Sequence, residues 1–188
     1  MKSRKFICSL LIICIGLFSW AIVSKITEPK TVVNMANYKQ YKDANELFDR
    51  ADLVVIGSTD QSLKESKVIA NTTPNGLLGE TYSLTDFNIL KVIKGDYKSS
   101  NVKVLQDAAY IDDKYFVMEG YTPLSEKKKY ILFLIKTLDS DNYAIMGVNQ
   151  GKFNIDGQDS KEEKQIQKDE HYKKLKKEVL EKFSAEIK

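Results

Sequence analysis

Residues 130–135 read YILFLI, and every side chain in this run is apolar or aromatic. A strand that is apolar on both faces is typical of the centre of a covered sheet, so the run predicts a central strand. Residues 53–57, LVVIG, have the same character and predict a second covered strand that ends at a glycine. The turn at 139–142 leads from the first run into YAIMGV at 143–148, which predicts an antiparallel hairpin.

Alternating polarity predicts the other strands. Residues 80–93 form one long alternating stretch, and shorter ones lie at 101–106 and 150–155. The expected inward face of the long strand holds Phe87, Ile89 and Ile93. Its opposite face, expected to be partly covered, holds Leu90 and Val92. The polar, turn-rich stretches 60–78 and 107–129 are expected to be loops.

A short helix precedes these strands. Residues 41–51 repeat apolar side chains at intervals of three and four, and Asp43 or Asn45 can cap the first turn. We therefore expect a mainly β fold with flanking helices (α+β). We expect five or six antiparallel strands in a domain at 38–158. These strands are expected to form an OB-like barrel, because closing a sheet into a barrel leaves no exposed strand edges.

Residues 159–188 predict a long C-terminal amphipathic helix. One helical stripe collects its apolar side chains, namely Ile166, Tyr172, Leu175, Val179, Phe183 and Ile187. Nine basic side chains are offset by eight acidic ones in this segment. A membrane-surface helix is usually strongly basic, so packing on the barrel or on another copy of the helix is favoured.

The first 25 residues predict a signal peptide or signal anchor. Residues 6–23 contain no charged side chain, follow three cations, and span roughly 27 Å as a helix, close to the thickness of a bilayer core. An anchor is favoured, with the rest of the chain outside the cell membrane. Cleavage after Ala21, with small Ser19 at the −3 position, is the alternative and gives a secreted protein. Residues 26–37 are expected to be a tether.

Charge and cysteine usage exclude several classes of function. The net charge of +3 comes from the first 25 residues, which carry +4, and residues 26–158 hold 16 basic and 18 acidic side chains. Nucleic acid is therefore an unexpected partner. Cys8 and Cys14 both lie in the apolar segment, so the exported part has no disulfide, thiolate metal site or thiol nucleophile. A lipid-modified Cys14 is a weaker alternative, because Ile12 and Ile13 stand where small residues are needed.

No catalytic, cofactor-binding or metal-binding set is predicted. His171 is the only histidine and has no second imidazole or thiol near it in the sequence. Two groups of acidic residues could supply oxygen ligands for Ca²⁺: Asp112 and Asp113 with Asp107 and Glu119, and Asp139 with Asp141. Both lack the glycine and terminal acid of the twelve-residue calcium loop, and solvated turns explain them more simply.

Five tyrosines offer a candidate ligand face, with packing in the core or at its rim as the alternative reading. They are Tyr82, Tyr110, Tyr115, Tyr121 and Tyr130. Aromatic platforms of this kind serve as binding surfaces on OB barrels.

The order of the apolar phrases resembles a known fold family. The phrases are ADLVVIG (51–57), FNILKVIKGDY (87–97), VKVLQ (102–106), PLSEKKKYILFL (123–134) and QGKF (150–153). They resemble exported proteins of Gram-positive bacteria with no settled function and, more loosely, the netrin-like (tissue-inhibitor-of-metalloproteinase-like) OB barrel. Inhibitors of that fold use an N-terminal cysteine held by disulfides, which this chain lacks, so the resemblance implies the barrel and not protease inhibition.

The sequence thus predicts a membrane-tethered extracytoplasmic binding or interaction module without evident catalysis. Its expected partner is a protein or a component of the cell envelope, and residues 6–23 provide the membrane contact. The alternative is a hydrolase that uses carboxylates on cell-envelope polymers.

Overall fold

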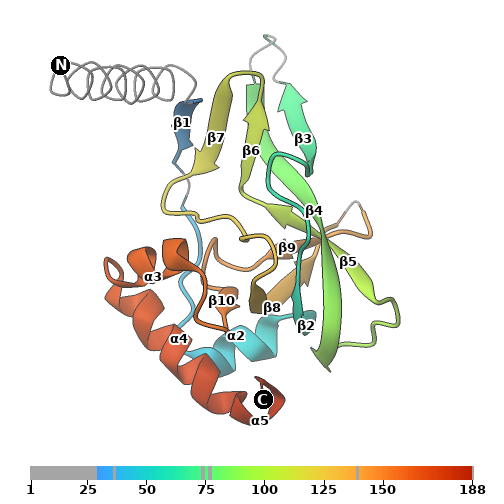
Figure 1. Cartoon of the computed structure of the whole chain (residues 1–188), viewed down its shortest axis with the longest axis vertical. Coiled ribbons are helices and arrows are strands. Elements are labelled where there is room, and N and C mark those ends of the chain that lie inside the picture. The colour runs from blue at the N-terminus through green and yellow to red at the C-terminus, as the bar shows by residue number, and fades with distance from the viewer. Residues whose placement is uncertain (1–28, 36, 73–74, 76–77, 139, 188) are drawn as a thin grey trace, which may run out of the picture.

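The computed structural model describes residues 29–187 apart from 36, 73–74, 76–77 and 139. Within that part of the chain, no helix has the length and apolarity needed to cross a bilayer. The predicted signal or anchor at 1–25, including the apolar run 6–23, lies outside the described residues. Figure 1 shows strands in the upper and right-hand parts of the molecule and helices below and to the left.

Five strands close into a barrel. They are β2 (Leu53–Ser58), β4 (Leu78–Lys94), β5 (Asn101–Gln106), β8 (Lys129–Lys136) and β9 (Tyr143–Ile145). The order is β8-β2-β4-β5-β9, and β9 pairs back onto β8. The predicted barrel is therefore confirmed, as is the hairpin between β8 and β9. All pairings in the barrel are antiparallel except β5 with β9, which is parallel, so the expectation of a wholly antiparallel barrel is wrong in this one place.

The two most apolar runs are central because both of their faces are covered. Leu53 and Val55 of β2 belong to one buried cluster with Phe87, Val102 and Leu132 from the other barrel strands. The alternate residues of β2 and β8 belong to a second cluster that includes the helices. Each fully buried apolar side chain of this size contributes about 1.5–3 kcal/mol, so these strands dominate the stability of the barrel.

Two bulges in β4 change which side chains of the long strand face inward, so the expected inward face is wrong in part. The pairs Val54↔Lys94 and Val55↔Val92 leave Ile93 as an extra residue, and Leu90 is skipped in the same way next to Gly57. After each bulge, the alternation of side chains between the two faces of the sheet is shifted by one residue. Ile93 consequently packs against the helix-side cluster, not with Phe87 and Ile89 inside the barrel, and Leu90 is 63% exposed.

Segments expected to be loops contain further strands. A separate sheet has the order β1-β7-β6 and is formed by β1 (Lys30–Asn34), β7 (Lys114–Met118) and β6 (Ala108–Ile111). The expectation of a loop at 107–129 is therefore wrong for these residues, and part of the segment expected to be a tether, 26–37, forms β1. The stretch 60–78 contains β3 (Lys67–Thr72), which pairs with the first half of β4, and β10 (Lys152–Asn154) pairs with β8 outside the barrel.

The helices cover one outer face of the barrel. The predicted helix is α2 (Ala44–Arg50), and its N-cap Asp43 accepts hydrogen bonds from the amides of Asn45 and Glu46. The C-terminal segment is not one long helix, which corrects the prediction. It consists of α3 (Ser160–Ile166), α4 (Glu170–Lys182) and α5 (Ser184–Ile187). Asp169 stops α3 from continuing, because its extended backbone and its carboxylate cap the start of α4.

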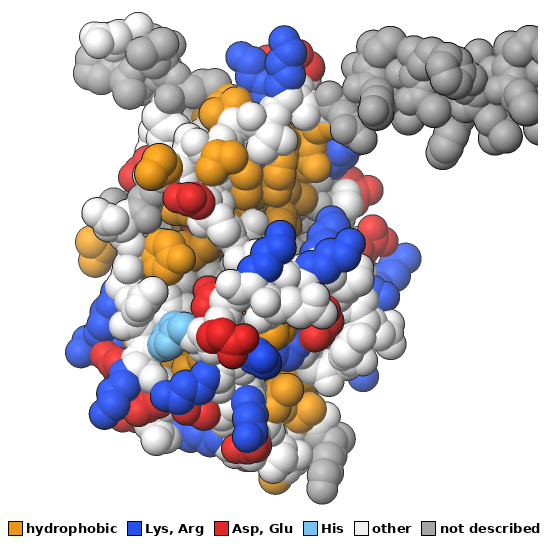
Figure 2. Space-filling model, turned by 90° about the vertical axis from the view of Figure 1, so that its left-hand side faces the viewer, with side chains coloured by type: hydrophobic (Ala, Val, Ile, Leu, Met, Phe, Trp, Pro, Cys, Tyr) orange, Lys and Arg blue, Asp and Glu red, His pale blue; other side chains and the backbone are white. Residues whose placement is uncertain are grey.

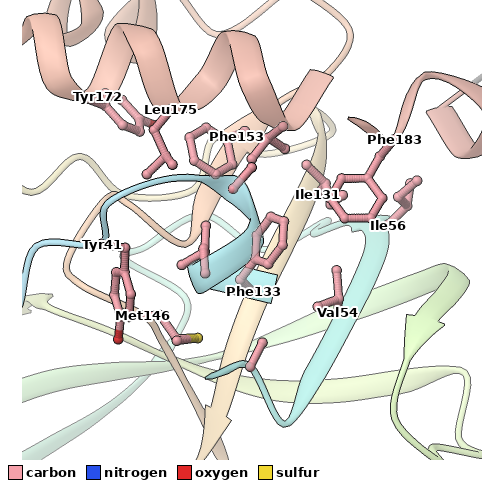
Figure 3. Close-up of a cluster of buried hydrophobic side chains, with 14 of the residues drawn as sticks. Tyr41, Val54, Ile56, Ile131, Phe133, Met146, Phe153, Tyr172, Leu175 and Phe183 are labelled. Atoms are coloured by element: carbon pink, nitrogen blue, oxygen red, sulfur yellow. The ribbon is translucent and has the colours of Figure 1, made fainter. Parts of the chain in front are cut away.

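The apolar stripe of the C-terminal segment packs on the barrel, as favoured from the sequence. Figure 3 shows Tyr172 and Leu175 of α4 pointing toward Phe153, and Phe183 lying beside Ile131. The Tyr172 and Phe153 rings stack with centroids 5.5 Å apart. This packing fixes α4, and with it the position of α3.

Candidate functional site

A cleft of about 720 Å³ lies between α3, the segment 62–64 and the β6–β7 hairpin. Its size falls within the usual range for small-molecule sites. Among the described residues, three tyrosines and four lysines line it, and Glu126 is the one acidic residue of the lining. On the face shown in Figure 2, hydrophobic side chains gather in the upper half and Lys side chains lie directly beneath them. We call this site the tyrosine–lysine cleft.

The β6–β7 hairpin provides two of the tyrosines. Tyr110 and Tyr115 are direct partners across the hairpin, and their rings stack with centroids 4.7 Å apart and planes 28° from parallel. The hairpin turns at Asp112, whose φ of 52° is a backbone conformation that Asp tolerates better than most residues. Burial, with a smaller effect of Tyr110, raises the pKa of Tyr115 to about 12. The phenol therefore stays neutral at physiological pH.

The third tyrosine is held by a buried polar contact. Tyr121 is 5% exposed, and its hydroxyl donates a hydrogen bond of 3.1 Å to Oε1 of Gln106 at the end of β5. The same oxygen accepts 2.7 Å from the amide of Leu124. Burial raises the pKa of the Tyr121 phenol well above its usual value. These bonds attach the segment that lines the cleft to the rigid barrel.

Three of the lysines come from α3 and the turn that follows it. Lys161, Lys164 and Lys168 are exposed and lie three and four positions apart, which is the spacing of one helix face. Lys64 lies on another wall of the cleft, with Nζ 5.1 Å from the centroid of the Tyr110 ring. Four cations from two separate segments therefore surround the tyrosines.

The opposite face of α3 is fixed by a buried carboxylate. Glu162 is fully buried and accepts two hydrogen bonds of 3.0 and 2.9 Å from the amide of Asn154. Its carboxylate also lies 3.2 Å from Lys176 Nζ and 3.7 Å from Lys152 Nζ. Because Glu162 anchors the inner face of α3, the lysines on its outer face are held at the cleft.

A second polar path connects α3 to the cleft lining. The hydroxyl of Tyr130 donates 2.6 Å to Asp159, the N-cap of α3, and accepts 2.9 Å from the amide of Ser125. Lys152 Nζ lies 3.3 Å from the hydroxyl of Thr122. Burial lowers the pKa of Lys152, whereas the charges of Glu162 and Asp159 oppose this effect.

The structure separates the five predicted tyrosines. Tyr110, Tyr115 and Tyr121 come together in the tyrosine–lysine cleft. Tyr130 is fully buried in the barrel and serves the hydrogen bonds described above. Tyr82 lines a different cavity, together with Glu80 and Asp107. The predicted ligand face therefore holds three of the five rings.

The acidic groups considered for Ca²⁺ do not assemble. Within the described part of the chain, no three His, Cys, Asp or Glu side chains approach closely enough to hold a metal ion. Asp112 and Asp113 lie at the turn of the β6–β7 hairpin, and Asp141 pairs with Lys136 at 3.2 Å. Asp139 lies outside the described residues.

His171 lies near the start of α4 and contributes to a very small cavity of about 20 Å³. Its Nε2 is buried and, among the residues that the structure describes, has no hydrogen-bond partner. The cavity has room for about one water molecule. Hydrogen bonding of Nε2 to a single water explains its lack of a protein partner more simply than a ligand does.

A second cavity of about 620 Å³ was missed by the sequence reasoning. It is lined by Glu80 and Tyr82 of β4, by Asp107 after β5, and by residues of β1. Burial, and to a lesser extent Glu80, raises the pKa of Asp107 to about 6. A carboxyl group with a raised pKa in a cavity is a recognised sign of a functional site.

The lysines of the cleft were also missed. The sequence gives Lys161, Lys164 and Lys168 only as part of the balanced charge of residues 159–188, and nothing in it connects them with Lys64 or with a tyrosine hairpin. The signal that could have drawn attention to them is the scarcity of acids three or four positions away on the same face.

The comparisons with known proteins return no relatives: no protein-family model matches the chain, and no curated protein matches it. The likeness to netrin-like OB barrels therefore stays a prediction.

Proposed function

We propose that this chain is a membrane-tethered extracytoplasmic binding module and that the tyrosine–lysine cleft is its ligand site. The tether and the location are supported by the sequence of residues 1–25, where an apolar run follows three cations. Secretion after cleavage of that segment is the alternative. The partner expected there is a component of the cell envelope or an envelope protein.

One observation carries the proposal. The cleft combines exposed cations with aromatic rings that are positioned by buried hydrogen bonds to the barrel. Ring faces and lysine side chains that are not paired with acids suit recognition of a ligand. Binding is therefore the function proposed for this site.

The test compares retention of envelope material by matched variants. The full-length chain, purified in detergent and immobilised, is incubated with cell-envelope extract, and bound glycan, lipid and protein are quantified. The double variant Lys161→Gln/Lys164→Gln is expected to lose most of the material that the unmodified chain retains. Lys103→Gln/Lys174→Gln removes two exposed lysines that do not line the cleft and serves as the control. Equal retention by the unmodified chain and the cleft variant would contradict the assignment of the cleft as the ligand site.

The location is tested separately on intact cells. A membrane-impermeant amine reagent is expected to label the exposed lysines of the domain without cell lysis. Labelling only after lysis would contradict the extracytoplasmic placement. The mass of the protein in the membrane fraction distinguishes a retained anchor from cleavage after Ala21.

The Asp107 cavity supports a second candidate function, a carboxylate-dependent hydrolase. A carboxyl with its pKa raised to about 6 can act as a general acid, and Glu80 lies beside it in the same cavity. An activity screen on envelope polymers, repeated with Asp107→Asn and Glu80→Gln, tests this candidate. Any activity that both variants retain in full would exclude these two carboxyls as its source.

A further inference from the structure

We propose that the ligand of the tyrosine–lysine cleft is an anionic saccharide, a sugar chain that carries carboxylate or phosphate groups. This inference rests on the proposed function, since it names the ligand class of the same site. The cations would pair with the acidic groups, and the tyrosine rings would contact the sugar rings.

Within the part of the chain that the structure describes, the lysines of the cleft are not neutralised by ion pairs. Among the described residues, Lys64, Lys161, Lys164 and Lys168 form no ion pair, whereas the α4 lysines 173, 174, 176 and 177 each pair with a glutamate. The acid of the cleft lining, Glu126, pairs with Lys127 at 3.3 Å. The cleft therefore carries a local excess of positive charge in a domain that is nearly neutral as a whole.

The spacing of these charges favours a ligand with more than one anionic group. Lys161 and Lys164 are separated by one turn of α3, about 4.5 Å along the helix axis. Lys168 continues the row beyond the end of the helix, and Lys64 stands on another wall. A ligand with a single charge would satisfy one of these cations, whereas a short acidic chain can satisfy several.

The remaining lining favours sugar rings. Tyr110 and Tyr115 form a stacked aromatic surface, on which the apolar face of a pyranose can pack. Ser62, Ser125 and Gln165 add hydroxyl and amide groups that can bond sugar hydroxyls. Nucleic acid is disfavoured, because residues 26–158 hold 16 basic and 18 acidic side chains, whereas a nucleic-acid-binding domain usually carries a large excess of positive charge.

Titration calorimetry of the full-length chain in detergent tests the inference with defined probes. The acidic saccharides are short oligogalacturonate, which carries carboxylates, and a phosphorylated mannan oligosaccharide. The comparison probes are a neutral maltooligosaccharide, inorganic polyphosphate and oligo-dT. At least one acidic saccharide is expected to bind roughly tenfold more tightly than each comparison probe, and to weaken with added salt. The stronger of the two shows which acidic group is preferred.

Variants connect the binding to the cleft. Each exposed lysine removed is expected to weaken binding roughly two- to fivefold, so Lys161→Gln/Lys164→Gln should cost roughly tenfold. Lys103→Gln/Lys174→Gln should cost nothing measurable. Tyr115→Ala should weaken binding by roughly tenfold, and Tyr115→Phe should restore most of it because the ring is kept. The lysines are exposed and Tyr115 is partly buried, so the unfolding temperature of each variant is measured to show whether it has kept its fold.

Several results would overturn the inference. Polyphosphate binding as tightly as the acidic saccharides would mean that charge alone is recognised, and equal binding of the neutral saccharide would mean that charge is not. Tightest binding of oligo-dT would assign a different class of ligand. If no acidic saccharide binds while retention of envelope material still depends on the cleft, the ligand class is wrong but the proposed function stands. If neither binding is found, both fall.

Discussion

Glu162→Gln should destabilise the protein far more than the same change at the neighbouring Glu163. Both carboxylates contact Lys176, at 3.2 Å from Glu162 and 2.7 Å from Glu163. Their environments differ, because the side chain of Glu162 is fully buried and that of Glu163 is 48% exposed. The pair of variants therefore separates burial from ion-pair distance.

The expected cost follows from the buried partners of Glu162. Its charge balances that of Lys152, which is fully buried and 3.7 Å away, and removing one member of a buried pair costs about 3–5 kcal/mol. Glutamine can keep one hydrogen bond to the amide of Asn154, which places the expected loss at the lower end, about 3 kcal/mol. An exposed pair is worth about 0.2–1 kcal/mol, so Glu163→Gln should cost less than about 1 kcal/mol.

Urea and thermal unfolding followed by circular dichroism measure both variants. For a chain of this size, about 3 kcal/mol corresponds to a fall of about 6–12 °C in the unfolding temperature for Glu162→Gln. Glu163→Gln should shift the temperature by no more than about 4 °C. Losses of equal size in the two variants would refute the assignment of Glu162 as the anchor of α3.

Three further predictions concern pH, a close backbone contact and a helix cap. Because the pKa of Asp107 is raised to about 6, the folded state holds its proton more tightly, and the unfolding free energy should fall by about 2 kcal/mol as pH rises from 4 to 6. Asp107→Asn should abolish this dependence in urea unfolding across that range, whereas an unchanged pH profile would contradict the burial of the carboxyl. Gly57→Ala should destabilise by more than about 3 kcal/mol, because a Cβ there would lie 2.0 Å from the carbonyl oxygen of Asn88, and near-normal stability would be the contrary result. Asp169→Ala should cost about 1 kcal/mol in thermal unfolding by removing the hydrogen bond to the amide of Tyr172, while Asp169→Asn should retain most of the stability.

The barrel could be predicted because its strands are unusual in composition. Runs such as 53–57 and 130–135 are apolar on both faces, and this pattern leaves few alternatives to a covered central strand. The cap at Asp43 and the docking of the C-terminal stripe followed from equally local signals. The parallel pairing of β9 with β5 could not be predicted, because it depends on how the barrel closes and not on either strand alone.

The bulges and the second sheet depend on contacts that a local pattern does not contain. Ile93 follows the same alternation as Phe87 in the sequence, and only the register of β4 against β2 sends it to the helix side. The strands β6 and β7 are short and interrupted by polar residues, and they gain stability from each other and from β1. Their sequence therefore resembles a loop.

The candidate site shows the same limit. Aromatic side chains are conspicuous in a sequence, but the turn of one hairpin brings Tyr110 and Tyr115 together, and a hydrogen bond to Gln106 holds Tyr121 in the same cleft. Lys161 and Lys164 reach that cleft because the buried Glu162 fixes the orientation of α3. The position of the exposed lysines depends on the buried contacts of the same helix, and these contacts are known only when the helix has been placed on the barrel.

Chemical-shift mapping by NMR tests the central claim most directly. Backbone amides of the full-length chain in detergent are followed while oligogalacturonate or the phosphorylated mannan oligosaccharide is added. We predict that the largest shifts fall on residues 62–64, on 110–115 and on 161–168, the segments that contribute side chains to the tyrosine–lysine cleft. Shifts confined to the cavity of Glu80 and Asp107, or spread evenly over exposed lysines such as Lys103, would contradict it.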